Sequence, residues 1–214
     1  GMQSERESIK RLCDPKSKVS SHFVINKKGQ VYKLVQENRI AWHAGKSCWG
    51  KYKNLNRNSI GIELVNKGHD FGYTIFPKKQ LSSLAKICKK MIKKYKIKKK
   101  NVIGHSDVAP LRKIDPGEKF PWEKLADKNI GIWHKYQKKE LIKFRGFKVS
   151  KKSKLDFLKN LKKIGYCFGS KEKVNFLKIV KGFQRHYRKE VINGIVDKEC
   201  LIIADNLSKI SKNT

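Results

Sequence analysis

The sequence of 214 residues is poor in acidic side chains and in long apolar runs. It contains no run of about 18 apolar residues, which excludes a membrane-spanning helix in these residues. A charged start followed by an apolar stretch is also absent, so no secretion signal is visible. Hydrophobic residues still make up 38% and aromatic residues 10% of the chain, so we expect a folded core.

The pattern of the five cysteines does not indicate a disulfide framework. They are odd in number, widely spaced and without a C-x-x-C motif. This pattern argues against a set of disulfides and against a cysteine zinc knuckle. We therefore expect scattered, partly buried thiols, which do not indicate a compartment. These residues are Cys13, Cys48, Cys88, Cys167 and Cys200.

Basic side chains outnumber acidic ones by 52 to 18, which gives a formal net charge of +34. Of the basic residues, 44 are Lys and 8 are Arg. Two interpretations stay open: the lysine drift of an AT-rich genome, or attraction to a polyanion such as a cell envelope, a membrane surface or a nucleic acid. Proteins that recognise specific nucleic-acid sequences favour Arg, because its planar guanidinium forms paired hydrogen bonds with guanine edges and phosphates. The lysine excess therefore argues against specific nucleic-acid binding.

The spacing of apolar residues predicts the elements of a first domain over residues 1–134. Two strands joined by a turn at Lys28-Gly29 should form a hairpin. The near-continuous apolar strand SIGIELV is typical of a central position in a sheet. Together these elements predict an α/β (α+β) fold with a central mixed sheet flanked by helices. The helices are expected at 3–13 and 81–95, and the strands at 19–25, 31–35, 59–65 and 101–104.

After Trp133 the pattern changes. Residues 135–154 are rich in lysine with little periodicity, which predicts a basic linker. Three amphipathic segments follow and predict a small three-helix domain over 155–214. The segments are 155–164, 174–187 and 198–210.

The loop of residues 101–122 carries the densest chemistry of the chain. Residues 105–115 of this loop combine a histidine, two carboxylates and two cations, and prolines restrict the backbone of the loop. A His and a carboxylate on one rigid loop suit a zinc site with mixed nitrogen and oxygen ligands, although a charged surface loop would show the same residues. The residues are His105, Asp107, Arg112, Lys113 and Asp115.

Two further positions stand out. Glu63 lies inside the apolar strand, where a carboxylate is costly unless it is paired or serves as a catalytic base. A place on the solvent-facing side of the strand is the alternative. Trp42 and His43 stand between alanines and a glycine, as residues at the rim of a binding cleft do, although a half-buried Trp beside a hydrogen-bonded His would fit as well.

Seven sequence blocks in this order carry a family resemblance: SSHFVI (20–25), GQVYKLV (29–35), AWHAG (41–45), NSIGIELVN (58–66), GHSDVAP (104–110), RKIDPG (112–117) and FPW (120–122). They resemble the zinc-dependent N-acetylmuramoyl-L-alanine amidases of the type 2 family, whose fold is shared with peptidoglycan recognition proteins. The resemblance spans residues 3–133. The helix segment VKGFQRHY (180–187) is similar to the three-helix peptidoglycan-binding domain that follows the catalytic domain in one subgroup.

The resemblance implies a zinc cofactor. Its ligands would be His105, Asp115 and a third residue, a His, that lies upstream of residue 1 on an N-terminal strand which is missing here. His22 corresponds to a structural histidine of the family rather than to a ligand, and Asp107 is expected to point away from His105. With two ligands, the chain as numbered is expected to bind zinc weakly or not at all.

The resemblance also implies the roles of the remaining site residues. Glu63 would be the catalytic carboxylate that moves protons, and Lys113 would stabilise the oxyanion of the transition state. Trp42 and His43 would line the substrate cleft. Arg112 would hold a peptide carboxylate, or would form a salt bridge within the fold.

The resulting function hypothesis is zinc-dependent hydrolysis of the amide bond between N-acetylmuramic acid and L-alanine, in bacterial cell-wall turnover or recycling. The partner would be peptidoglycan or a muropeptide, intact or anhydro, and the expected location is the cell envelope or periplasm. A peptidoglycan-binding protein without catalysis is the main alternative. Nonspecific nucleic-acid binding is a weaker one, and attraction to anionic envelope surfaces could accompany any of these functions.

Overall fold

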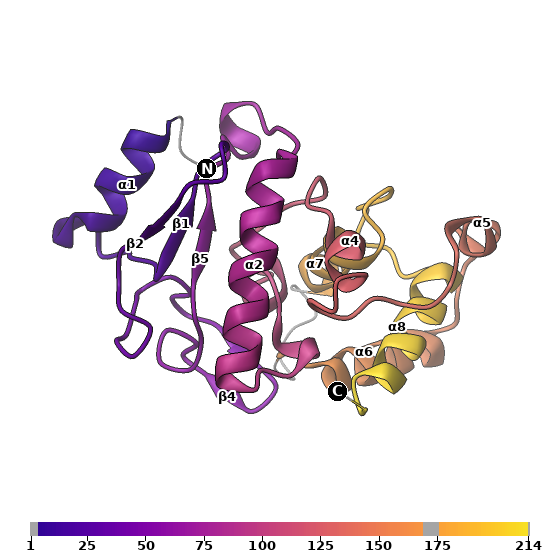
Figure 1. The fold of residues 1–214 in the computed structure, drawn as a ribbon. Coiled ribbons are helices and arrows are strands. Elements are labelled where there is room, and N and C mark those ends of the chain that lie inside the picture. The colour runs from indigo at the N-terminus through magenta and orange to yellow at the C-terminus, as the bar shows by residue number, and fades with distance from the viewer. Residues whose placement is uncertain (1–3, 169–175, 214) are drawn as a thin grey trace. The chain divides into compact units, whose positions relative to one another are not determined.

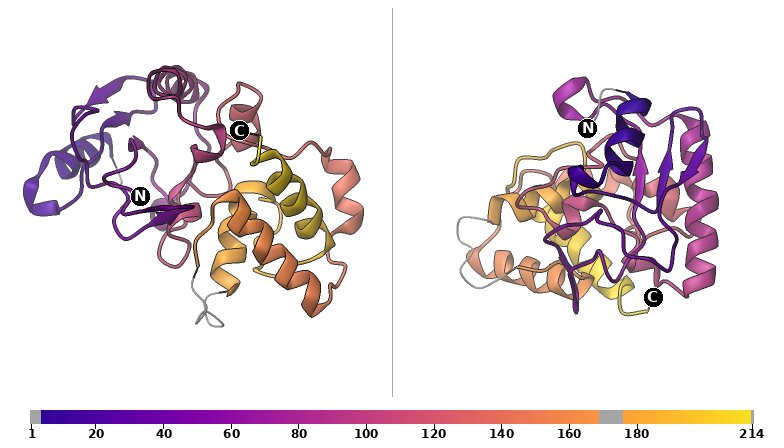
Figure 2. Two further views of the ribbon diagram at one scale, coloured as in Figure 1. Left: turned by 90° about the horizontal axis from the view of Figure 1, so that it is seen from below. Right: turned by 90° about the vertical axis from the view of Figure 1, so that its left-hand side faces the viewer.

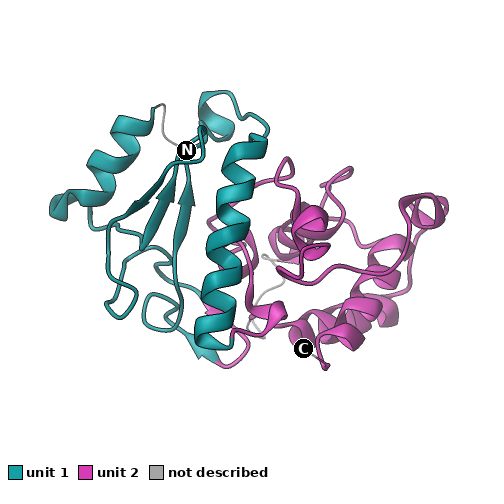
Figure 3. Ribbon diagram, viewed as in Figure 1, with its two compact units in different colours: residues 1–47, 52–96 teal, residues 48–51, 97–214 magenta. Residues whose placement is uncertain are grey.

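The computed structural model describes residues 4–168 and 176–213. The chain divides into two compact units (Figure 3). Unit 1 comprises Gly1–Ser47 and Tyr52–Lys96, and unit 2 comprises Cys48–Lys51 and Ile97–Thr214. Across the described residues, none of the helices combines the length and the apolar character that crossing a membrane requires.

Unit 1 is built on a three-stranded mixed sheet with the order β2-β1-β5 (Figure 1). The strands β1 (Phe23–Ile25) and β2 (Val31–Lys33) pair antiparallel, which confirms the predicted hairpin, and Gly29 takes a positive φ of 87° in the connection. The strand β5 (Ile62–Leu64) pairs parallel to β1.

The prediction that the SIGIELV strand is central is wrong for the described residues, because β1 occupies the middle of the order. Apolar residues on both sides of a strand show that its two faces are covered. They do not show that other strands pair with both of its edges. The mixed sheet and the α+β fold class are as predicted.

The helix α1 (Glu5–Cys13) packs against this sheet. The side chain of Ser4 caps its first turn, where orphan backbone N–H groups need an acceptor. On its apolar side, Leu12 is buried in a cluster with Val24 of β1 and with Val65 at the end of β5. This cluster fixes the face of the sheet to which Val24 points.

The longest helix of unit 1, α2 (Lys78–Tyr95), begins after Pro77, which has no N–H to leave unpaired. The side chain of Gln80 is fully buried, and its Nε2 donates to the carbonyl oxygens of Ile25 (2.8 Å) and Val65 (3.1 Å). These bonds attach the helix to the sheet, and the strands lie between α1 and α2 in Figure 1.

The short elements complete the two units. The strand predicted at 101–104 is wrong, because its first residue ends a turn of 3-10 helix and the following backbone runs extended without a strand partner among the described residues. In unit 1 the short elements are η1 (Pro15–Ser17), β4 (Tyr52–Lys53) and η2 (His69–Phe71); in unit 2 they are β3 (Cys48–Trp49), η3 (Lys99–Asn101), α3 (His105–Val108), α4 (Trp122–Ala126), α5 (Lys138–Leu141) and η4 (Ile142–Phe144).

Three longer helices form the C-terminal part of unit 2, as the amphipathic segments predict, and α6 and α8 lie side by side (Figure 2). Gly165 ends α6 with a positive φ of 142°, and Asp197 caps the start of α8. Residues 174 and 175 of the second predicted helix lie outside the described residues. The helices are α6 (Lys151–Ile164), α7 (Phe176–Tyr187) and α8 (Lys198–Ile210).

The first compact unit ends at Lys96, whereas the sequence predicts a first domain over residues 1–134. Within the predicted linker 135–154, Leu141 is buried, and Arg145 donates two hydrogen bonds of 2.7 and 2.8 Å to Glu199 of α8. The domain bounds 1–134, 135–154 and 155–214 stay predictions.

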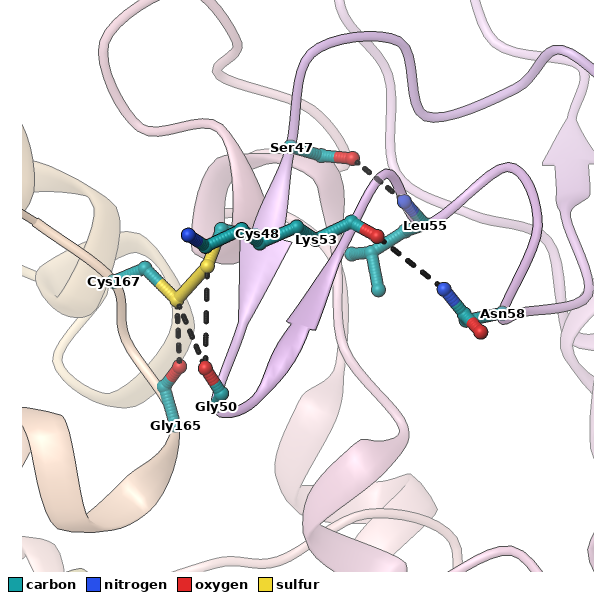
Figure 4. Close-up of a disulfide and its surroundings, with 8 residues drawn as sticks. All are labelled: Ser47, Cys48, Gly50, Lys53, Leu55, Asn58, Gly165 and Cys167. Atoms are coloured by element: carbon teal, nitrogen blue, oxygen red, sulfur yellow. Dashed lines mark hydrogen bonds between the residues drawn. A yellow bond between two sulfur atoms is a disulfide. The ribbon is translucent and has the colours of Figure 1, made fainter.

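The expectation of free thiols is wrong for one pair, because Cys48 and Cys167 form a disulfide (Figure 4). Their Cα atoms lie 5.7 Å apart although 119 residues separate them in sequence. Next to the disulfide, the N–H of Gly50 donates to the carbonyl oxygen of Gly165 over 2.6 Å. Such a pairing depends on tertiary contacts, which is why spacing along the chain did not show it. The cysteines at 13, 88 and 200 are free.

Candidate active site

Unit 2 brings the two predicted zinc ligands together. His105 is the first residue of α3, and its Nδ1 lies 2.7 Å from Oδ2 of Asp115. The N–H of Ser106 donates to the carbonyl oxygen of Asp115 over 2.9 Å, which ties the two segments through their backbones. The His105 side chain is 16% exposed and that of Asp115 is 52% exposed, so the pair is open to solvent on the carboxylate side.

The surroundings keep Asp115 ionised. Burial acts to raise its pKa, but the hydrogen bond to His105 and the charges of His105 and Lys113 outweigh burial and hold the pKa of the carboxyl below its ordinary value. Lys113 follows α3 in a turn in which its N–H donates to the carbonyl oxygen of Ala109. The charge of Lys113 therefore helps to lower the pKa of Asp115. Arg112, in the same turn, is exposed.

The pair fits part of a zinc site. One imidazole nitrogen and one carboxylate oxygen at hydrogen-bond distance are a donor set that zinc accepts. Within residues 4–168 and 176–213, no group of three or more His, Cys, Asp or Glu side chains could hold a metal ion. The roles of His105 and Asp115 as ligands, and that of a third ligand upstream of residue 1, stay predictions.

Asp107 points into the protein. Its side chain is 1% exposed and accepts hydrogen bonds from the hydroxyl of Tyr166 and from Nδ1 of His186. Both partners belong to the C-terminal part of unit 2. A carboxylate held in this way is not available as a substitute ligand.

In unit 1, Glu63 lies at the centre of β5 and is half-buried. The parallel register places it opposite Val24 of β1. Side chains of a strand alternate between its two faces, so Glu63 shares a face with the position of Gly61, two residues earlier. The environment of Glu63 is thus a partly covered sheet face, and its role as the catalytic carboxylate stays a prediction.

His43 lies over that same face. A Cβ added to Gly61 would collide with Cγ of His43, so only glycine leaves room for the imidazole at this position. Glu63 and His43 therefore share one face of the sheet. Sequence reasoning missed Gly61; its signal was a glycine inside an otherwise apolar strand, which marks a close approach.

The loop that carries Trp42 is anchored by two polar side chains. Ser20 Oγ accepts a hydrogen bond of 2.8 Å from the N–H of Trp42, and Asn56 Oδ1 accepts bonds from the N–H groups of Ala44 (2.7 Å) and Gly45 (3.2 Å). The indole of Trp42 is left 53% exposed. An exposed aromatic on a fixed loop suits a ligand contact. Neither Ser20 nor Asn56 was predicted from the sequence.

His22 is structural, as the family resemblance implies. Its Nδ1 accepts a hydrogen bond of 3.0 Å from the N–H of Gly61, so its Nε2 carries the proton and donates to the carbonyl oxygen of Arg39 over 3.0 Å. Both ring nitrogens are occupied by backbone groups. The imidazole could bind a metal only by giving up one of these bonds.

Comparison with protein-family models matches residues 1–118 to the family described as N-acetylmuramoyl-L-alanine amidase. The chain is also 34% identical over 216 aligned residues to N-acetylmuramoyl-L-alanine amidase AmiD of Escherichia coli (strain K12), covering 94% of this chain and 76% of that protein. The chain belongs to the N-acetylmuramoyl-L-alanine amidase family. This confirms the predicted family and enzyme class, a hydrolase of peptidoglycan turnover.

Solved structures of relatives extend the match through the C-terminal helices. The complex of Escherichia coli AmiD with anhydro-N-acetylmuramic acid-L-Ala-D-gamma-Glu-L-Lys superimposes with a TM-score of 0.84 at 32% identity, over 96% of this chain and 84% of that one. AmpDh3 from Pseudomonas aeruginosa gives 0.84 at 30% identity, over 97% and 87%. The amidase fold class is therefore shown for nearly the whole chain.

Proposed function

We propose that this amidase cleaves the bond between the lactyl carbonyl of N-acetylmuramic acid and L-alanine in soluble muropeptides, anhydro forms included. The contact between His105 and Asp115 carries the proposal, because it gathers a nitrogen and an oxygen ligand beside the cation Lys113. Support for the substrate class comes from AmiD and AmpDh3, whose structures include complexes with an anhydro-muropeptide substrate and with anhydromuramic pentapeptide.

The residues of the chain take complementary parts in this reaction. Glu63 accepts the proton of the attacking water and returns it to the leaving amine of L-alanine. Lys113 places its ammonium against the developing oxyanion. Trp42 and His43 contact the sugar or peptide, and Arg112 pairs with a peptide carboxylate.

Zinc is the cofactor of this proposal, with His105 and Asp115 as two of its ligands. When bound, it supplies Lewis-acid chemistry, polarising the carbonyl and lowering the pKa of a water molecule to about 7. Elemental analysis of purified protein tests the assignment. We expect His105→Ala and Asp115→Ala to bind less zinc than the unaltered chain, whereas equal, stoichiometric zinc in all three would exclude both ligands.

A direct assay tests the reaction. Incubation of an anhydro-muropeptide with a form that includes the expected N-terminal strand should release a peptide with a new N-terminal alanine, detected by mass spectrometry. Chelation with EDTA should stop the release, and added zinc should restore it. Release that continues undiminished in EDTA would overturn the zinc mechanism while leaving the amidase activity in place.

Binding to peptidoglycan without hydrolysis is the second candidate. It is favoured by the absence of a third metal ligand near His105 and Asp115 among the described residues. Sedimentation with purified sacculi separates the two functions. Binding without any release of peptides would favour the second candidate.

The cell envelope or periplasm is the proposed location. The disulfide between Cys48 and Cys167 supports it, because such bonds persist in oxidising compartments. Trapping free thiols with an alkylating reagent in intact cells tests this, since both cysteines should escape modification. The +34 charge is proposed to add attraction to anionic envelope surfaces, which should weaken in about 0.2 M salt.

A further inference from the structure

The buried carboxylate of Asp107 connects the turn that carries His105 to the C-terminal helices. It accepts three hydrogen bonds: 2.8 Å from the N–H of Gly104, 2.6 Å from the hydroxyl of Tyr166 and 2.8 Å from Nδ1 of His186. Desolvating a carboxylate is costly unless donors replace the water. These three donors therefore fix the position of Asp107, and two of them come from residues that follow position 150 in the chain.

The donors are themselves held rigidly. The ring of His186 stacks on Trp122, with ring centres 3.9 Å apart and planes inclined by 17°. Tyr166 is buried between Trp49 and Phe183, at 5.0 and 6.5 Å between ring centres. Neither side chain can follow a shift of Asp107 without disturbing aromatic packing.

A second contact, independent of Asp107, joins α3 to α7. A Cβ added to Gly182 of α7 would lie 2.6 Å from the carbonyl oxygen of Ser106 and 3.1 Å from Cβ of Pro110. The backbone of α7 thus lies directly against the turn of α3. Only glycine permits this approach.

The short helix α3 also contacts the segment that carries Asp115. Gly104 packs so closely on Pro116 that an added Cβ would lie 2.6 Å from its Cδ, and the N–H of Ser106 is bonded to the carbonyl oxygen of Asp115. These contacts join α3 to the segment of Asp115, so a shift of α3 would strain the contacts on which the relative placement of His105 and Asp115 depends. Their 2.7 Å contact is maintained by the support behind the turn.

We propose that Asp107, Tyr166 and His186 are positioning residues of the amidase, through which the C-terminal helices hold His105 and Asp115 in register. The inference rests on the proposed role of that pair as zinc ligands. In this proposal the C-terminal helices complete the catalytic site, in addition to any part they take in binding the cell wall.

The test uses the full chain without metal, so that it does not depend on zinc binding. Tyr166→Phe and His186→Gln each remove or weaken one bond to Asp107, and Asp107→Asn removes its charge. Tyr32→Phe is the matched control, because it removes a tyrosine hydroxyl bond of 2.7 Å to a carboxylate, Glu5, in unit 1.

Hydrogen exchange followed by NMR is the first measurement. In Tyr166→Phe and His186→Gln, amides of residues 106–109 should exchange about tenfold faster, the effect of losing about one charge-assisted hydrogen bond on local opening. Amides of α8 should keep their protection. Equal acceleration in α3 and α8 would show a role in global stability alone and would overturn the proposal.

The ring-nitrogen signals of His105 are the second measurement. They should shift or split in the network variants, because the contact with Asp115 loosens, and stay unchanged in Tyr32→Phe. Unchanged His105 signals in Tyr166→Phe and His186→Gln would contradict the proposal even if α3 exchanges faster. If Asp107→Asn does not fold, the two milder variants decide the question.

Loss of zinc affinity gives an independent check where binding is measurable. Residues that orient metal ligands typically change affinity by about 10- to 100-fold. A drop of that size in Tyr166→Phe, with Tyr32→Phe unchanged, supports positioning. Full affinity with a lowered melting temperature would assign the network to stability.

Discussion

At the scale of single residues, the site depends on how a few charged groups are placed in partly covered surroundings. Glu63 is half-buried on a sheet face that also carries the ring of His43, and Asp115 stays ionised because His105 and Lys113 outweigh its burial. Each group is chemically ordinary. For Asp115, the fold supplies the neighbours that keep its carboxyl ionised.

Substitution of the proposed base gives a direct prediction. Glu63→Gln should lower turnover of a muropeptide by about 10²- to 10⁴-fold, the usual effect of removing a general base. The melting temperature should stay unchanged, because the amide has the same shape. Kinetics and a thermal melt check both points.

The control is Glu123→Gln, which alters an exposed carboxylate on α4 and should keep full activity. If Glu63→Gln unfolds, the carboxylate is structural. In that case its assignment as the base is wrong.

Asp197 gives a pH-dependent prediction. Burial acts to raise its pKa, but hydrogen bonds from the N–H groups of Gly146 and Cys200 and the charge of Arg188 outweigh burial and lower it. A lowered folded-state pKa adds stability above about pH 4, and this stability is lost as the pH falls through that lowered value.

Asp197→Asn should therefore be less stable than the unaltered chain at pH 7, by about 1–3 kcal/mol, with a difference that shrinks towards pH 3. Denaturant unfolding at both pH values measures it. Asp156→Asn, an exposed position paired with Lys159 on α6, should change stability by less than about 0.5 kcal/mol. A constant difference at both pH values would show that the charge of Asp197 is not responsible.

At the scale of elements, the packing of α7 on the turn of α3 is the contact on which the site relies. Gly182 makes it possible, because a side chain there would collide with the backbone of Ser106. In an isolated helix, alanine is favoured over glycine by about 1 kcal/mol. Here tertiary packing reverses that preference.

Gly182→Ala should destabilise the protein by about 1–3 kcal/mol, since the collision involves backbone that cannot rotate away. It should also reduce amidase activity, because the turn carries His105. Thermal melts and turnover assays measure the two effects. Lys154→Ala on an exposed position of α6 serves as the control and should change neither. Higher stability in Gly182→Ala would contradict the close packing.

At the scale of the whole molecule, a single disulfide joins residues that are 119 positions apart. Closing a long loop lowers the entropy of the unfolded chain, and native disulfides typically contribute about 2–4 kcal/mol. Reduction of the bond between Cys48 and Cys167 should therefore lower the melting temperature.

The measurement is a thermal melt with and without dithiothreitol. The double variant Cys48→Ser, Cys167→Ser should match the reduced protein and no longer respond to the reductant. Cys13→Ser, which alters an exposed free thiol, should behave like the unaltered chain. A melting temperature that does not respond to the reductant would show that the disulfide adds nothing to stability.

The sequence alone determined the fold class, the hairpin, α2, the C-terminal helices and the family, because apolar periodicity and seven ordered blocks are local patterns. It also singled out His105 and Asp115, as a histidine and a carboxylate on one proline-restricted loop, and Glu63, as a carboxylate inside an apolar strand. Only the tertiary structure decided that β1 is the middle strand, that Cys48 binds Cys167, and that Gly61 and Gly182 make room for a ring and for a helix. It also decided that Asp107 meets Tyr166 and His186. The physical reason is common to all of these: each depends on which distant segments the fold brings into contact, and no periodicity along the chain encodes that pairing.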